Sequence, residues 1–270
     1  MPIDRRKLVL GAALAATGGK SFAQSPIQAG HPRRRRPVIL VHDSWHGGWC
    51  WRQIVQRLRA AGHPTYTPTL TGVGERAHLR SPAIGLGTHI ADVAAVIECE
   101  ELDEVILVGH GYAGIVLAGV ADQAGDRLAH VVLLDAIIPK AGCSMWDLMP
   151  ADISDRQSRE LIDGYLVKPP SPANLGVAGG EAMDLQWLAR RLTPHPAACF
   201  TQALTLKNGG LATLPRTYID CTKPSVYGPE DPFAKLARSE PGWTVQTIDS
   251  GHEAMISSPD ALAHALLDIA

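Results

Sequence analysis

A turn made of small residues lies near the middle of the chain, between an apolar run and a stretch with helical character. The run at 105–108 ends in Gly-His-Gly-Tyr-Ala-Gly, residues 109–114, and the helix-like stretch covers 115–123. A buried strand, a tight turn and a helix in this order expose a nucleophilic serine when the turn reads Gly-x-Ser-x-Gly. Gly111 stands at the serine position, so the turn offers the geometry for nucleophilic catalysis without the nucleophile.

The same glycines permit a different interpretation, a turn that binds a phosphate group. Gly109, Gly111 and Gly114 satisfy the spacing G-x-G-x-x-G, and Asp135 falls near the distance at which an acidic residue binds a ribose. However, strand-like segments already precede the turn, and the other motifs of the chain point elsewhere. Nucleotide binding is therefore the less favoured alternative.

Strand-like and helix-like segments alternate around this turn. Continuous apolar runs at 37–41, 105–108 and 131–134 are typical of strands buried on both faces of a parallel sheet. We expect further strands at 65–69, 216–221 and 244–248, and helices at 49–61, 88–102, 115–123, 233–239 and 260–269. This order predicts an α/β fold with a mostly parallel, doubly wound sheet.

One long segment interrupts the alternation. Residues 139–214 contain prolines, short helical stretches and no clear strand, and they are too many for a plain loop. We interpret this segment as a helical cap inserted into a single domain that covers residues 37–270.

The N-terminal residues precede the predicted domain. A basic segment at 5–7 leads into an apolar stretch at 8–16, followed by small residues up to Ala23. This pattern indicates a signal peptide over 1–23, and its paired arginines indicate the twin-arginine route. We expect an exported, periplasmic or secreted bacterial protein with a linker at 24–36; a disordered tail is the alternative.

Composition narrows the classes of partner. The chain has 270 residues, 46% of them hydrophobic, and a formal net charge of −2, which suits one globular domain and gives no basis for binding nucleic acid. The apolar leader is too short to span a bilayer, so we expect no membrane span in the mature chain. The five cysteines lack metal-binding spacing, and we expect neither a metal nor a cofactor.

Several stretches, spread from residue 38 to the end, resemble one family. They read VHDSWHGGWCW, TYTPTLTGVGERAH, the turn at 109–114, LLDAIIP, RRLTPHP and DSGHEAM. The chain resembles the α/β-hydrolase superfamily, and within it the branch of hydroxynitrile lyases, plant methylesterases and bacterial esterase-like relatives, with the nucleophilic serine replaced by Gly111. The resemblance implies an α/β-hydrolase fold with a helical cap, but not one particular reaction.

The resemblance also implies a catalytic triad of Ser, Asp and His in chain order. His252, in the turn after the last strand, takes the place of the catalytic histidine. The acid normally follows the penultimate strand, where Lys223 stands at the expected position. Asp231 is the nearest candidate for the acid, and Asp220 and Asp135 are alternatives.

In this family the oxyanion hole uses two backbone N–H groups, here those of Ser44 and Tyr112. Both belong to the main chain, so neither is lost with the serine. Asp43 stands where esterases have Gly and hydroxynitrile lyases have Thr or Asn. Its carboxylate would either face the pocket or, as a loop carboxylate, bind nearby backbone N–H groups.

A substrate pocket under the cap is expected around Trp45, His110, Trp146 and Trp187. Each tryptophan would serve equally well as core, and a structural role is the favoured interpretation of His110, which precedes the nucleophile position. An apolar cap with few charges indicates a small, neutral ester, lactone or carbonyl compound.

Without the serine there is no acyl-enzyme route of the usual kind. We expect a cofactor-free enzyme in which His252 activates a water in the space the serine left, or in which His252 and Asp43 move protons in a lyase-type reaction. The alternatives are a hydroxynitrile-lyase-like C–C lyase and a catalytically silent protein that binds a small molecule or a partner.

Overall fold

The computed structural model describes residues 35–177, 182–223, 226–227 and 231–270. The predicted signal peptide and nearly all of the linker lie outside the described residues. Residues 35–270 group into one unit by their contacts. In the part of the chain that is described, no helix is both long and apolar enough to cross a membrane.

A parallel sheet forms the centre of this unit. Its strand order is β2-β1-β3-β4-β7-β8, and every pair is parallel. The strands are β1 (Val38–Val41), β2 (Thr65–Tyr66), β3 (Val105–His110), β4 (Leu128–Leu134), β7 (Arg216–Cys221) and β8 (Trp243–Ile248). The predicted parallel α/β sheet is confirmed, and the fully buried strands β1 and β3 explain why their sequences are continuously apolar.

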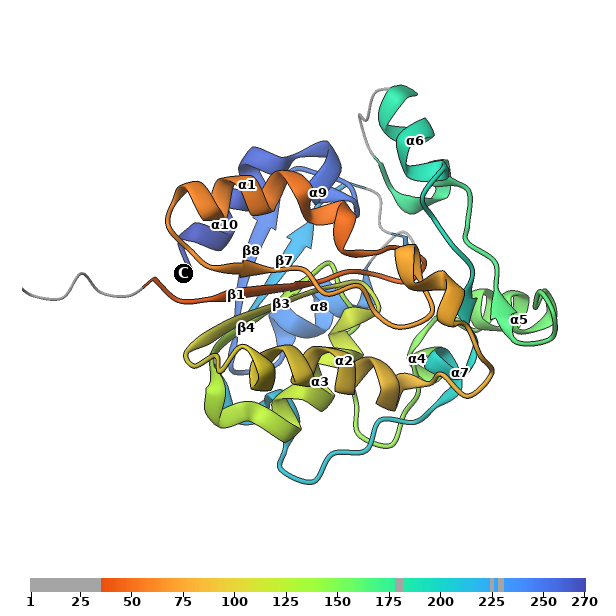
Figure 1. Ribbon diagram of the computed structural model, residues 1–270, viewed down its shortest axis with the longest axis horizontal. Coiled ribbons are helices and arrows are strands. Elements are labelled where there is room, and N and C mark those ends of the chain that lie inside the picture. The colour runs from red at the N-terminus through yellow and green to blue at the C-terminus, as the bar shows by residue number, and fades with distance from the viewer. Residues whose placement is uncertain (1–34, 178–181, 224–225, 228–230) are drawn as a thin grey trace, which may run out of the picture. The chain divides into compact units, whose positions relative to one another are not determined.

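Helices cover both faces of the sheet (Figure 1). One face carries α1 (Arg52–Ala60), α9 (Ala254–Ser257) and α10 (Pro259–Leu267), and the other carries α2 (Leu86–Cys99), α3 (Ala113–Ala124) and α8 (Pro232–Ser239). The short 3-10 helices are η1 (Gly48–Trp51), η2 (Gly74–Leu79), η3 (Gly125–Arg127), η4 (Pro172–Leu175) and η5 (Gly210–Thr213). Helix α3 begins directly after the turn that contains Gly111 and is buried over most of its length, which places that turn deep in the fold.

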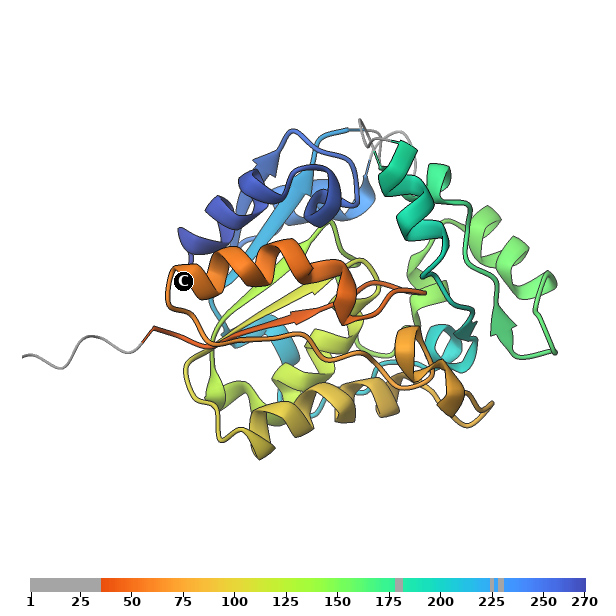
Figure 2. The same cartoon turned by 45° about the horizontal axis from the view of Figure 1, so that its top comes forward.

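The inserted segment lies beyond the carboxyl ends of the strands (Figure 2). It contains α4 (Met145–Leu148), α5 (Ala151–Arg159), α6 (Ala182–Ala189) and α7 (Ala198–Thr201). It also contains a small antiparallel pair, β5 (Leu166–Val167) with β6 (His195–Pro196), so the expectation of a segment without strands is wrong in this detail. Strands of two residues carry no periodicity that a sequence could reveal.

The carboxyl ends of four strands of the sheet bring distant residues together, with β7 lying between β4 and β8. Asp43 follows β1, Gly111 follows β3, Asp135 follows β4 and His252 follows β8. Because parallel strands end at the same edge of a sheet, the loops that carry these residues meet beneath the cap.

Candidate active site

Asp43 and Gly111 occupy neighbouring loops and compete for one space. Gly111 has φ +55°, a left-handed conformation that glycine adopts without a side-chain clash. A Cβ atom built on Gly111 would overlap the carboxyl group of Asp43, and even the farther carboxyl oxygen, Oδ2, would lie only 2.6 Å away. The carboxyl group of Asp43 therefore fills the position where a serine side chain would begin.

Hydrogen bonds hold Asp43 in this orientation. The backbone N–H of Tyr112 donates to Oδ1 of Asp43 at 2.5 Å. His42 donates through Nδ1 to the backbone carbonyl of Asp43 at 2.7 Å and accepts the N–H of Leu70 at Nε2 at 3.0 Å. Burial lowers the pKa of His42 to about 3, so its ring is neutral and makes both bonds at once. Asp43 combines the two open interpretations: its carboxylate lines the pocket and contacts His252, and it also accepts a nearby backbone N–H.

His252 lies between two carboxyl groups. Its Nδ1 is 2.6 Å from Oδ2 of Asp135, and its Nε2 is 3.2 Å from Oδ2 of Asp43. All three side chains are buried. Asp135, His252 and Asp43 thus form a continuous row, with Asp43 at the end where a serine hydrolase has its nucleophile.

The two carboxyl groups set the charge of His252. Burial lowers the pKa of His252, but the hydrogen bonds to Asp135 and Asp43 outweigh burial and hold this pKa well above its usual value. Burial also raises the pKa of Asp43, but the hydrogen bond to His252 and the nearby histidines outweigh it, so the pKa of Asp43 lies well below its usual range. The resting site contains an imidazolium and a carboxylate in contact.

This charge state changes the expected chemistry. A protonated His252 cannot take a proton from water, and Asp43 fills the space in which that water was expected. The expected oxyanion hole is also altered, because the N–H of Tyr112 already donates to Asp43. Ser44 lines the pocket, and its hydroxyl oxygen is buried without a partner among the described residues.

The carboxylate that contacts His252 is Asp135, the alternative candidate, and this corrects the preference for Asp231. Asp231 caps helix α8, where Oδ1 accepts the N–H groups of Phe233 and Ala234 at 2.8 and 3.2 Å. Asp220, on β7, forms an ion pair with Arg238, on α8.

His110 supports the catalytic histidine from behind. Its Nε2 donates to the backbone carbonyl of His252 at 3.0 Å, and the two ring centroids are 4.1 Å apart. Burial lowers the pKa of His110 to about 4, so this ring stays neutral beside the charged one. The structural role expected for His110 agrees with these contacts; it does not line the substrate cavity formed by the described residues.

A small inner cavity, about 120 Å³ in volume, opens onto Asp43 and His252. Its other described walls are mostly apolar and come from Ser44, Trp45, Met145, Met149, Ile153, Arg156, Gln157, Pro170, Asn174, Leu175, Val226 and Tyr227. Trp45 is therefore at the pocket. Trp146 and Trp187 are not: Trp146 packs beside Phe200, and Trp187 lies between the guanidinium groups of Arg52 and Arg191.

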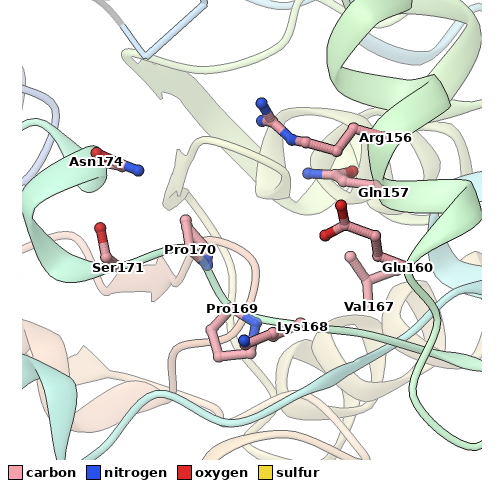
Figure 3. A pocket seen from close by; sticks show the side chains of 9 residues that line it. All are labelled: Arg156, Gln157, Glu160, Val167, Lys168, Pro169, Pro170, Ser171 and Asn174. Atoms are coloured by element: carbon pink, nitrogen blue, oxygen red, sulfur yellow. The ribbon is translucent and has the colours of Figure 1, made fainter.

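An outer cavity of about 340 Å³ adjoins the inner one. Both are lined by Arg156, Gln157, Pro170 and Asn174. In Figure 3, Arg156 and Gln157 extend from α5 into the space that faces Asn174. No motif in the sequence marked these cap residues, because they lie on short helices and loops whose residue spacing matches no known catalytic or binding motif.

Trp45 connects the loop of Asp43 to the cap. Its backbone N–H donates to Nδ1 of His195 at 3.2 Å, its indole N–H donates to the carbonyl of Val167 at 3.2 Å, and its carbonyl accepts the N–H of Thr193 at 3.0 Å. The residue has φ +65°, a conformation that is uncommon for a bulky side chain. The contacts with the cap maintain this conformation.

Among the described residues, two clusters of side chains have the spacing of metal ligands, but most of their donor atoms serve other partners. One is Asp43, His110 and His252, which already bind one another or the backbone. In the other, His89 uses both ring nitrogens for Tyr112 and Thr71, and His195 accepts an N–H at Nδ1, which leaves the hydrogen on Nε2. These donor sets do not fit a metal ion as they stand.

The residues of the nucleotide-binding alternative have structural explanations. A Cβ on Gly114 would strike the backbone carbonyl of Ile137, so glycine there permits close packing of α3. Asp135, the expected ribose ligand, is bound to His252.

Comparison with known proteins agrees with this architecture. A model of the alpha/beta hydrolase family matches residues 38–265. The chain is 42% identical over 239 residues to a carbendazim hydrolyzing esterase from Nocardioides sp., covering 84% of this chain and 97% of that protein. It is 26% identical over 270 residues to methylesterase 3 from Arabidopsis thaliana, covering 88% of this chain and 97% of the relative.

Solved structures show the same fold. An extracellular alpha/beta-hydrolase from a Paenibacillus species superposes with a TM-score of 0.77 at 23% identity, covering 86% of this chain and 98% of that one. Tomato methylketone synthase I in complex with 2-tridecanone gives a TM-score of 0.70 at 20% identity, covering 87% and 97%.

Proposed function

Because the chain belongs to the alpha/beta hydrolase family, with esterases among its relatives, we propose that it is a cofactor-free hydrolase that acts on a small neutral ester, lactone or carbonyl compound without a nucleophilic serine. The observation that carries the proposal is the row of Asp135, His252 and Asp43. This row ends in a carboxylate at the position of the missing serine.

His252 acts first as an acid in this proposal. It starts as an imidazolium, so its first step is to donate the Nε2 proton to an oxygen of the substrate. After that step the ring is neutral and accepts a proton from a water whose oxygen bonds to the carbonyl carbon. The bond from this carbon to the leaving oxygen then breaks, and the leaving oxygen takes a proton from one of the two new hydroxyl groups, which gives an acid and an alcohol. Asp135 fixes the ring through Nδ1 during both steps.

The pocket supports a small substrate. An inner cavity of about 120 Å³ with apolar walls admits a compact neutral group beside Asp43, and the outer cavity receives the remainder. The names of two relatives, a carbendazim hydrolyzing esterase and a methylesterase, agree with small esters as the first class to test.

A lyase-type reaction is the second candidate. The imidazolium of His252 and the carboxylate of Asp43 are 3.2 Å apart and place an acid and a base in one pocket. An addition or elimination at a carbonyl requires such a pair. Cyanohydrins are the appropriate substrates for this candidate.

The test compares the wild type with His252→Ala and Asp43→Asn on small esters, lactones and cyanohydrins without added cofactor. Asp260→Asn, at an exposed carboxylate, is the matched control. We expect both site variants to lose at least about 100-fold in kcat/KM, the usual contribution of a proton-transferring side chain. A silent wild type that is nevertheless stabilised against heat by a small ligand would instead identify a binding protein.

We also propose that the protein is exported by the twin-arginine route. The residues that support this lie before the described part of the chain. Replacing Arg5 and Arg6 each by lysine should retain the protein in the cytoplasm, and unchanged export would overturn the proposal.

A further inference from the structure

The two oxygens of Asp43 have different partners. Oδ1 accepts the backbone N–H of Tyr112 at 2.5 Å, and Oδ2 lies 3.2 Å from Nε2 of His252. The N–H of Tyr112 is the group that in this fold stabilises the negative oxygen of a tetrahedral intermediate. Here it is already directed at an oxygen of the protein, and not at a vacant position for a substrate carbonyl.

This arrangement fits an ester formed on Asp43 itself. If Oδ2 carried a carbon substituent, Oδ1 would become the carbonyl oxygen of that ester and would remain bound to Tyr112. Attack of water on this ester would then place negative charge on Oδ1, where the N–H donor already is. The geometry thus serves the hydrolysis of an Asp43 ester without rearrangement.

We propose that Asp43 is a covalent nucleophile toward small neutral alkyl electrophiles, such as epoxides or alkyl halides, and forms an alkyl ester that is then hydrolysed. The proposal rests on the site of the proposed function and extends its substrates from carbonyl compounds to saturated carbon. Carboxylates of Asp and Glu are established nucleophiles in other enzymes.

The occupied oxyanion hole favours a saturated carbon as the target. Attack on a carbonyl creates a negative oxygen on the substrate, which would need the N–H of Tyr112 that Asp43 holds. Displacement at a saturated carbon creates no such oxygen. The leaving group departs opposite the nucleophile, and Arg156, Gln157 and Asn174 line the same cavity from the cap and carry N–H donors for it.

The first step conserves charge and atoms. Oδ2 of Asp43 forms a bond to carbon, the bond from carbon to the leaving group breaks, and the leaving group takes the bonding electrons. Asp43 is then a neutral ester. Because its carboxylate helped to hold the proton on His252, the pKa of His252 falls and the ring gives this proton to the leaving group or to solvent.

The second step regenerates the site. Neutral His252 takes a proton from water while the water oxygen attacks Cγ of Asp43. The negative charge develops on Oδ1, against the N–H of Tyr112. Collapse expels the alkoxide, which takes up one proton to become the alcohol, and the Asp43 carboxylate and the His252 imidazolium are restored. With an alkyl halide, the sum is one halide and one water giving one alcohol and one hydrogen halide. With an epoxide, the leaving oxygen stays in the molecule, and the sum is one epoxide and one water giving one diol.

The test follows the oxygen atom. The wild type turns over styrene oxide or butyl bromide in oxygen-18 water, and the peptide that contains Asp43 is then analysed by mass spectrometry. We expect oxygen-18 in Asp43 and in no other acidic residue, because water attacks Cγ of this side chain. In His252→Gln the second step should fail, and the alkyl group should remain on Asp43 as a stable adduct; Asp43→Asn should give neither signal.

Parallel assays with phenyl acetate and γ-butyrolactone separate this proposal from the proposed function. Suppose that His252 is needed to hydrolyse these esters, while no alkyl substrate leaves oxygen-18 or an alkyl group on Asp43. The proposal of covalent alkylation is then overturned, and the proposed hydrolase function stands. Turnover of an epoxide with oxygen-18 only in the product also overturns it. Silence with every substrate, and no adduct in either variant, overturns both.

Discussion

The carboxyl group of Asp43 and a side chain at position 111 exclude each other, because a Cβ on Gly111 would lie within the volume of that carboxyl group. Restoring the serine alone should therefore fail. We expect Gly111→Ser to lower the free energy of unfolding by about 1–3 kcal/mol, the usual cost of overpacking, increased by the positive φ at this residue.

Asp43→Gly should relieve this clash. In the double variant Asp43→Gly with Gly111→Ser, the free energy of unfolding should recover by about 1–2 kcal/mol relative to the sum of the single changes, as coupled neighbours do. A fluorophosphonate probe, which labels activated serines, should label the double variant and not Gly111→Ser alone. Labelling of the single variant would show that the carboxyl group of Asp43 moves aside readily.

Substitutions at Asp135 and Asp231 should affect different properties, activity in the first case and stability in the second. Asp135→Asn removes the acceptor that fixes His252, and we expect kcat to fall by up to about 10⁴-fold, as for the equivalent change in a serine protease triad. Asp231→Ala removes a helix cap and should cost about 1 kcal/mol of unfolding free energy, while kcat is retained. Steady-state kinetics and urea denaturation of both variants measure these effects; a large loss of kcat in Asp231→Ala alone would reverse the assignment.

The charge of His252 should depend on Asp43. Two carboxyl groups hold the pKa of His252 above its usual value, so replacing one of them in Asp43→Asn should lower that pKa. An NMR titration of the His252 ring measures the shift directly, with the exposed His78 as an internal reference. The alkaline limit of kcat should move to lower pH with it, because the imidazolium is the first acid in the reaction. An unchanged titration would contradict the row of hydrogen bonds.

Acid should destabilise the protein through its buried neutral histidines. Burial lowers the pKa to about 3 at His42, to about 4 at His89 and His110, and well below its usual value at His195. Below about pH 6.5 these histidines bind protons in the unfolded chain but stay neutral in the folded chain. The free energy of unfolding therefore falls with decreasing pH, by up to about 1.4 kcal/mol per histidine and pH unit.

Urea denaturation at about pH 7 and about pH 5 tests the sign and the slope. The raised pKa values of His46 and His252 add stability below the unfolded pKa, and this part is lost only as the pH rises through their folded values. Their contribution is therefore constant under acid conditions. His89→Gln should reduce the slope between the two pH values, whereas His78→Gln, at an exposed ring, should not; equal stability at both pH values would contradict the prediction.

Much of the fold was readable from the sequence because buried parallel strands are continuous apolar runs. The strand at 216–221 has the predicted bounds, β1 begins at Val38, one residue after the predicted start, and β3 extends the prediction by two residues, into His110. The strand pair of the cap was missed because each partner has two residues. The sequence also located the loops of the site, because turn residues follow each strand.

The site was harder to predict because its chemistry depends on the direction of side chains. Asp43 was a candidate, but nothing in the sequence distinguishes a carboxylate that faces outward from one that fills the place of a serine. The acid presented the same difficulty: Asp135 and Asp231 each follow a strand, and only the path of the loops decides which carboxylate contacts His252. The cap residues Arg156 and Asn174 could be assigned to the cavity only from the structure, because they belong to segments far apart in the sequence.

The attachment of Trp45 to the cap has a consequence for the order of events in a catalytic cycle. Three hydrogen bonds join this residue to Val167, Thr193 and His195, and Asp43 lies two residues before it. Any displacement of the cap large enough to break these bonds also releases the loop that aims the carboxylate. Under the proposed function, the admission of a molecule and the alignment of the Asp43 carboxylate would therefore be one coupled event, and the site would be inactive while the cap is open.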